Sequence, residues 1–192
     1  MGGIFSRLAI FDPIKVFVII LFIFFICLTF YGEGIYLTSI VLEAYTLPQL
    51  RKINYFKTQF IATHLFHGPI SHILIYSGWI LVFFALALLD LINGAMVTGY
   101  TIKILLITGG ITGFVYALAQ VYNGTTPYQF ITGMLTLTGL LLTSVATNNS
   151  IFASGIATYF LALIIIFNLT LLSYFVFLLI RKQKIDLDRS GY

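Results

Sequence analysis

The sequence predicts an all-α, polytopic integral membrane protein, a helical bundle of five or six transmembrane helices. Of its 192 residues, 60% are hydrophobic and 8% are charged, whereas a soluble domain carries roughly a quarter charged residues. Residues 58–89 and 104–180 contain no Asp, Glu, Lys or Arg. These uncharged stretches hold several apolar runs of the length, about 20 residues, that a bilayer-spanning helix needs.

The first predicted span covers residues 14–31, after which the glycines on either side of Glu33 are expected to end the helix. Residues 35–57 are apolar, but they include Glu43 and Pro48 and lead into a basic stretch. This mixed character favours an interfacial or half-inserted segment over a full crossing.

The next span is expected to begin after Gly68, with Pro69 in the first helical turn, where its missing N–H group costs nothing. The whole chain, 1–192, is interpreted as a single transmembrane domain. The remaining spans are predicted at about 70–90, 99–121, 128–147 and 151–180, the last as one strongly tilted helix, and 181–192 form a polar tail.

Basic residues at the two chain ends predict conflicting orientations. Arg7 and Lys15 favour an N-terminus inside the cell, and Arg181, Lys182 and Lys184 favour a C-terminus inside the cell as well. Both termini can be inside only if the chain crosses the membrane an even number of times. The C-terminal cluster is the stronger signal, so either the N-terminus is outside or the segment before the second span hides a sixth crossing.

The net charge of +4 is gathered at the chain ends and in one loop, which is typical of membrane orientation and lipid-headgroup contact. We therefore expect a multi-pass protein of the cell membrane. Its expected partners are the lipid bilayer and other membrane proteins in a complex, and not nucleic acid. The single cysteine, Cys27, excludes a disulfide within the chain and a cysteine-based metal site.

Small residues recur in the later spans, where they would allow close approach of helices in lipid. They include Gly109, Gly110, Gly113, Gly133, Gly139, Ser154, Gly155 and Ala157. Asp90 and Lys103 bracket the loop between the second and third spans and are expected to form a solvated pair.

The three histidines of the chain, His64, His67 and His72, fall within nine residues. Ionisable groups in so apolar a chain are candidates for a functional site. On one continuous helix, about 100° per residue would place all three on one face. Because Gly68 and Pro69 interrupt the segment, we expect His64 and His67 just before a helix and His72 in its first turn.

Four interpretations of these histidines remain open. They could be structural groups that hydrogen-bond at the membrane interface. They could bind zinc or copper, since His64 and His67 have the His-x-x-His spacing, although no Asp, Glu or Cys lies near them in the sequence. They could bind haem, with a second ligand from a methionine or another subunit. Finally, they could belong to a site of the oxyanion-stabilising type.

The last interpretation comes from a family resemblance. The stretch ATHLFHGPISHILIYSGWILVFFALALL resembles the second-helix region of rhomboid intramembrane proteases. His67 and His72 match the family's histidine pair, which has four residues between its members, and 35–57 resembles its membrane-embedded first loop. The resemblance implies that these histidines lie where a rhomboid stabilises its oxyanion.

The catalytic residues of that family are incomplete in this chain. Tyr76 stands where the family has asparagine, and Thr132 lies in the 130–133 stretch where the family has its serine nucleophile. No histidine follows His72, so no Ser–His pair is available in rhomboid order. The resemblance therefore implies a pseudoprotease without a cofactor that binds or positions transmembrane segments. Its candidate binding residues are His64, His67, His72, Tyr76 and Thr132.

A second functional hypothesis follows from the metal and haem interpretations. The chain also has a weaker similarity to membrane proteins with clustered histidines that are linked to terminal oxidases. Under this hypothesis it is a small subunit or assembly factor of a membrane redox complex. His64, His67 and His72 would then bind haem or copper.

Overall fold

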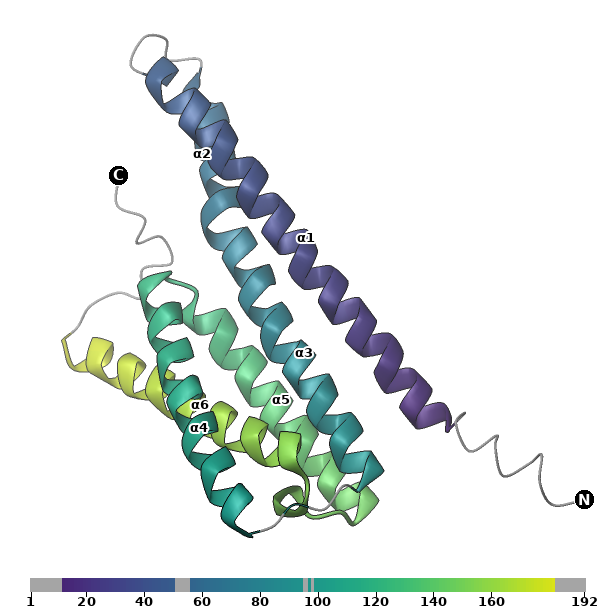
Figure 1. The fold of residues 1–192 in the computed structure, drawn as a ribbon. Coiled ribbons are helices and arrows are strands. Elements are labelled where there is room, and N and C mark those ends of the chain that lie inside the picture. The colour runs from purple at the N-terminus through teal and green to yellow at the C-terminus, as the bar shows by residue number, and fades with distance from the viewer. Residues whose placement is uncertain (1–11, 51–55, 95–96, 98, 182–192) are drawn as a thin grey trace, which may run out of the picture.

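The computed structural model describes residues 12–50, 56–94, 97 and 99–181, and this part of the chain is helical with no strand. Five helices are long and apolar enough to cross a membrane, which confirms the predicted class and selects five spans over six within the described residues. Their order is shown in Figure 1. The elements are α1 (Pro13–Leu50), α2 (Phe56–Leu65), a π-helical turn η2 (Phe66–Ile70), α3 (Ser71–Asn93), α4 (Gly99–Tyr122), α5 (Thr126–Thr147), the 3₁₀ turn η3 (Ile151–Ala153) and α6 (Gly155–Ile180).

The core of the bundle is built around α6, which packs against α3, α4 and α5. Its residues Phe160, Ile164, Phe167 and Leu171 are fully buried. These positions follow the i, i+4, i+7 and i+11 spacing of one helix face. α1, in contrast, packs on α2, η2 and α3, and most of its large apolar side chains are exposed, as expected for a helix that faces lipid.

Two glycines set the distance between α4 and α6. A Cβ atom on Gly109 would lie 2.3 Å from the carbonyl oxygen of Tyr159, and one on Gly113 would lie 2.2 Å from that of Leu163. Both distances are impossible for a real side chain. The predicted role of these small residues in close helix approach is therefore confirmed.

α6 does not begin at residue 151 as the sequence analysis expected. Ser154 has an extended backbone (φ −106°, ψ 129°) that separates η3 from α6. The Asp90 carboxylate, at the end of α3, accepts hydrogen bonds from the backbone N–H groups of Ile156 (2.7 Å) and Ala157 (3.2 Å). Asp90 thus caps α6 rather than forming a solvated pair with Lys103, because the first N–H groups of a helix need acceptors.

The first helix also differs from the prediction. α1 continues through Gly32, Glu33 and Gly34 to Leu50, so residues 35–50 belong to this helix and do not form a separate interfacial segment. Residues 51–55 of the expected segment 35–57 lie outside the described residues. The glycine serves packing rather than termination, because a Cβ on Gly32 would lie 2.9 Å from the backbone nitrogen of Ile75 in α3. The missing side chain lets the two helices approach closely.

Gly68 and Pro69 do not interrupt the helix either. They lie in the π-helical turn η2, which joins α2 to α3, and the run from Lys57 to Asn93 forms one candidate span. In a π turn the backbone hydrogen bonds join residues five apart instead of four, and this local change accommodates the missing N–H of the proline. The three histidines consequently lie in one continuous helical segment. His64 in α2 and His67 in η2 precede α3, and neither lies in an irregular loop.

α1 has 38 residues and is therefore about 57 Å long, nearly twice the hydrocarbon thickness of a bilayer. Figure 1 shows that its C-terminal part and α2 run side by side beyond the ends of α4, α5 and α6. We call this antiparallel pair, residues 36–50 of α1 together with α2, the arm. The histidine segment begins in the arm and enters the bundle with α3.

Candidate metal centre

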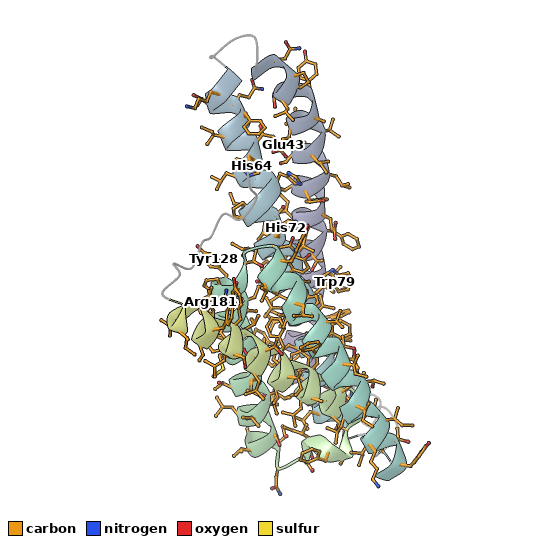
Figure 2. All side chains as sticks on the ribbon, turned by 90° about the vertical axis from the view of Figure 1, so that its left-hand side faces the viewer. Glu43, His64, His72, Trp79, Tyr128 and Arg181 are labelled. Atoms are coloured by element: carbon orange, nitrogen blue, oxygen red, sulfur yellow. The ribbon has the colours of Figure 1, made fainter. Side chains whose placement is uncertain are left out.

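Glu43 of α1 lies between two of the three histidines, at the base of the arm. Its side chain is buried, and its Oε1 lies 2.6 Å from Nδ1 of His64. Its other oxygen, Oε2, contacts Nδ1 of His67. One carboxylate therefore joins two imidazoles. Figure 2 shows Glu43 and His64 pointing toward each other across the gap between α1 and α2.

The local structure of the α2–α3 segment presents the two imidazoles on one face. His64 lies in the last turn of α2 and His67 in η2, and a three-residue spacing brings side chains to the same side of a helix. The fully buried hydroxyl of Ser71 donates to the backbone carbonyl oxygen of His67. This bond satisfies a carbonyl that the π turn takes out of the regular α-helical pattern.

Aromatic rings pack against both imidazoles and restrict their rotation. Phe60 stacks on His64, with ring centroids 5.8 Å apart and an interplanar angle of 11°. Tyr36 lies against His67 at a centroid distance of 5.0 Å. Because these contacts come from both helices of the arm, the imidazoles are positioned before any ligand arrives.

The ligand atoms offered by Glu43, His64 and His67 all lie within 4.8 Å of one another. Two imidazole nitrogens and one carboxylate oxygen form a set that suits Zn²⁺ and Fe²⁺. Three protein ligands leave at least one coordination position for water or a substrate, as in catalytic and exchangeable zinc sites. Glu43 of α1 thus provides the carboxylate ligand that is missing from the sequence around His64 and His67.

The charge at this position also favours a cation. Among the described residues, the ion-pair partners of Glu43 are His64 and His67, which are charged only when protonated. A buried carboxylate whose partners are imidazoles has no permanent countercharge, and burying a charge without one is costly. A divalent ion bound by all three groups would supply that charge and satisfy each ligand atom.

The third histidine belongs to a different environment. His72 does not contact Glu43. Its ring lies 6.4 Å from that of His67, 5.5 Å from that of Tyr36 and 5.8 Å from that of Tyr76. It lines a pocket between α1, α3 and α4 together with Glu33, Tyr36 and Tyr76. The structure therefore divides the histidine cluster into a pair on a carboxylate and a single residue on a pocket wall.

The two remaining candidate residues lie apart from the carboxylate. The Tyr76 hydroxyl accepts a hydrogen bond of 2.8 Å from the side-chain amide of Asn123. Thr132, on α5, donates to the carbonyl oxygen of Tyr128 and has its hydroxyl 3.4 Å from that of Ser77. Both hydroxyls thus take part in interhelix packing of the bundle. Thr132 is not brought together with any of the three histidines.

Sequence reasoning missed Glu43 as part of the site. It lies 21 residues before His64, on a stretch that was expected to form a separate interfacial segment. One signal was present, because a carboxylate in an apolar run of a membrane protein is a candidate functional group in its own right.

Comparisons with protein-family models, with curated proteins and with solved structures found no match for this chain.

Proposed function

We propose that this protein is a multi-pass membrane protein that binds a divalent transition-metal ion through Glu43, His64 and His67. The observation that carries the proposal is the buried carboxylate of Glu43, which contacts the Nδ1 atoms of both histidines from a different helix. The chain has six acidic residues, and this one is buried with imidazoles as its partners. A divalent ion would add the countercharge that a buried carboxylate needs.

Zinc is the ion that we propose first. Two imidazoles and a carboxylate match the three-ligand zinc sites that keep an open position, whereas structural zinc sites are closed by four protein ligands. The same two-histidine, one-carboxylate set also suits Fe²⁺. The carboxylate oxygen makes the site less suited to Cu⁺, which prefers soft sulfur ligands. An open position suits an ion that is exchanged or reacts, in keeping with a role in a membrane metal or redox system.

Metal analysis of the purified protein tests the proposal. We expect about one zinc or iron per chain after loading and removal of free metal. Glu43→Gln and His67→Ala should each reduce metal retention by at least tenfold, because loss of one ligand of three disables the site. His72→Ala is the matched control, since it removes the same side chain from the same segment but outside the Glu43 group. Equal metal content in all four proteins would exclude the site.

A visible absorption spectrum distinguishes the haem hypothesis. All three histidines lie on the single segment that runs from α2 into α3, so a haem bound between two helices would need its second ligand elsewhere. A Soret band in the unchanged protein that is lost in His67→Ala would show that this histidine binds haem and not the proposed metal ion. We expect no such band.

Binding of transmembrane segments by a rhomboid-like pseudoprotease stays a prediction from the sequence resemblance. Its support is the histidine pair, His67 and His72, and the hydrophobic helix that follows. The metal proposal rests instead on contacts between described side chains, and for this reason we place it first. If a bound transmembrane helix can be crosslinked to the metal-free protein, and the crosslink depends on His72 and Thr132, helix binding would become the first proposal and metal binding the second.

A further inference from the structure

One face of α3 is left open to the surrounding membrane beside α4. α3 packs on α1, α5 and α6, while α4 packs chiefly on α6. This side of α3 carries a stripe of side chains at helical spacing: His72, Ile75, Tyr76, Trp79, Ile80 and Phe83. Trp79 is exposed, whereas Ile75 and Ile80 are buried and the other three are partly buried. Polar groups stand at its upper end and apolar groups at its lower end.

Two adjoining pockets follow this stripe and share Trp79 and Tyr116. The upper one has a volume of about 350 Å³ and the lower one about 240 Å³. Together they fall in the range of roughly 300–1,000 Å³ that is usual for small-molecule sites. We call the two pockets the cleft.

The upper end of the cleft holds polar groups without partners. Among the described residues, neither the carboxylate of Glu33 nor the imidazole of His72 makes a hydrogen bond or an ion pair, although both are partly buried. The Tyr76 hydroxyl accepts one bond, from Asn123, and keeps its own proton to donate. The described residues that line this pocket include no Lys or Arg, so an anionic headgroup would meet Glu33 without a countercharge from them.

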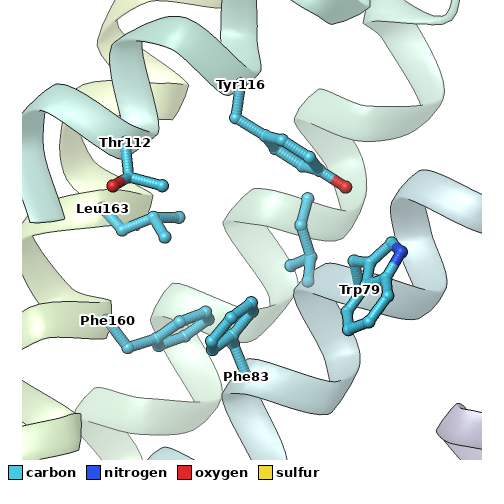
Figure 3. Close-up of a pocket in the computed structure, with 7 residues that line it drawn as sticks. Trp79, Phe83, Thr112, Tyr116, Phe160 and Leu163 are labelled. Atoms are coloured by element: carbon cyan, nitrogen blue, oxygen red, sulfur yellow. The ribbon is translucent and has the colours of Figure 1, made fainter.

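The lower end of the cleft is apolar. Phe83, Phe160 and Leu163 line it, and Figure 3 shows Trp79 and Tyr116 across the pocket from Thr112, Leu163 and Phe160. The one polar group of the lower wall, the Thr112 hydroxyl, is already bonded to the backbone carbonyl of Thr108 and to the Tyr159 hydroxyl. This end therefore offers contact area to a hydrocarbon chain and no hydrogen bond.

The wall of the upper pocket selects the kind of headgroup. Tyr36, Tyr76, Trp79 and Tyr116 surround it with aromatic faces, which favour a flat aromatic ring over a flexible glycerol group. A cavity of about 150 Å³ is enough to hold a benzene ring, so a substituted ring fits the volume. The Glu33 carboxylate and the His72 imidazole would each accept a hydrogen bond from a hydroxyl on such a ring.

We propose that the cleft binds an isoprenoid quinol. Its dihydroxylated ring lies in the upper pocket, with its hydroxyls directed to Glu33 and His72. Its isoprenoid tail follows α3 into the lower pocket and reaches the lipid between α3 and α4. The proposal does not depend on the metal site, because none of the residues that line the cleft is a proposed metal ligand.

The single tryptophan of the chain, Trp79, lies where the two pockets meet and reports occupancy of the cleft. Decylubiquinol, kept reduced, should quench the Trp79 emission of the full-length protein in detergent or nanodiscs in a saturable manner. N-acetyltryptophanamide in the same detergent corrects for non-specific quenching. The oxidised quinone has no hydroxyl to donate to Glu33 or His72, so it should bind at least about tenfold more weakly than the quinol, the effect of one buried hydrogen bond or more.

His72→Gln and Glu33→Gln should each weaken quinol binding about tenfold. Glu43→Gln is the matched control: it removes a carboxylate from the same helix outside the cleft and should leave quenching unchanged. Metal retention should be measured on the same samples. It should fall in Glu43→Gln and stay unchanged in His72→Gln and Glu33→Gln, so that failure of this proposal can be told apart from failure of the metal proposal. The headgroup without its tail should bind more weakly than decylubiquinol.

Three results would each overturn the proposal. The first is an absence of saturable quenching by the quinol. The second is an unchanged affinity in both His72→Gln and Glu33→Gln, with folding of each variant verified by circular dichroism and gel filtration. The third is displacement of the quinol by an equal concentration of monoolein, which would assign the cleft to single-chain glycerolipids.

Discussion

The carboxylate of Glu43 lies 2.6 Å from Nδ1 of His64, although the two residues are 21 positions apart and belong to different helices. The same carboxylate contacts His67, one turn further along the α2–α3 segment. Glu43 thus links the two helices of the arm through its pairing with His64. Stability of the arm and occupancy of the site should therefore be coupled.

This coupling gives a first prediction, that metal binding rigidifies the arm. An ion held by ligands from α1 and α2 crosslinks them, and saturation at 100 times the dissociation constant stabilises the folded form by about 2.7 kcal/mol. Addition of Zn²⁺ should raise the melting temperature and slow amide hydrogen exchange in α2 (Phe56–Leu65). A chelator should reverse both effects.

Glu43→Gln serves as the control for this experiment. The variant should show neither the rise in melting temperature nor the slower exchange, while exchange in α6 should be the same with and without metal. Protection by Zn²⁺ that is equal in the variant and in the unchanged protein would mean that the ion binds elsewhere.

The apolar runs of the sequence were sufficient to predict the class and most of the helices. The spans expected at 99–121 and 128–147 agree closely with α4 and α5, because uncharged runs bounded by polar turns have few alternatives in a membrane. Gly32 was misjudged because its effect depends on the neighbouring helix, and Pro69 was misjudged because the π turn η2 accommodates it within a helical segment. A glycine that would end an isolated helix in water here makes room for Ile75 of α3.

The site was predictable only in part for a similar reason. Clustering in the sequence identified His64, His67 and His72, but it could not show that the third faces a different pocket. Glu43 joined the site only once α1 was seen to continue past Gly34 and to run beside α2. The cleft could not be foreseen either, since it exists because α3 packs on α1, α5 and α6 and leaves its aromatic face beside α4 open.

A second prediction concerns the contact between α4 and α6. Gly113→Ala places a Cβ 2.2 Å from the carbonyl oxygen of Leu163 and must push the helices apart. We expect a loss of about 1–3 kcal/mol in the free energy of unfolding. Gly110→Ala is the control, because its Cβ would meet Ile166 at an ordinary 3.5 Å, and it should be neutral or stabilising by up to about 1 kcal/mol. Equal effects of the two changes in a thermal or denaturant titration would refute this account of the contact.

A third prediction concerns the cap of α6. Asp90→Ala leaves the N–H groups of Ile156 and Ala157 without their acceptor, and it should destabilise the protein by about 1–2 kcal/mol. Asp90→Asn keeps an acceptor oxygen and loses only the charge, so its cost should be smaller, about 0.3–1 kcal/mol. The free energy of unfolding, measured for both variants, checks that Asp90→Ala loses more stability than Asp90→Asn. A larger loss in Asp90→Asn than in Asp90→Ala would contradict the assignment of Asp90 as a cap.

A fourth prediction concerns orientation. Five crossings place the two ends of the chain on opposite sides of the membrane. Figure 2 shows Arg181, at the end of α6, and Tyr128, near the start of α5, on the side of the bundle from which the arm extends. Two described basic residues, Lys57 in α2 and Arg181, belong to this end. The sequence next to them adds Arg51, Lys52, Lys182, Lys184 and Arg189, so that seven of the ten basic residues of the chain are in or beside these two helix ends in the sequence.

By the positive-inside rule, the arm and the C-terminus should therefore face the cytoplasm and the N-terminus the outside. Reporter fusions at the two ends would check this. A C-terminal green fluorescent protein should fluoresce, and a reporter active only outside the cell should work at the N-terminus alone. Both ends on the same side would require a sixth crossing.

X-ray absorption at the zinc edge of the loaded protein is the most direct test of the central claim. It should show one zinc with two imidazole ligands and oxygen ligands at about 2.0–2.2 Å, and His67→Ala should remove one imidazole from the first coordination shell. A sulfur ligand at about 2.3 Å, or a zinc environment that is unchanged in both His67→Ala and Glu43→Gln, would show that Glu43, His64 and His67 do not form the metal site.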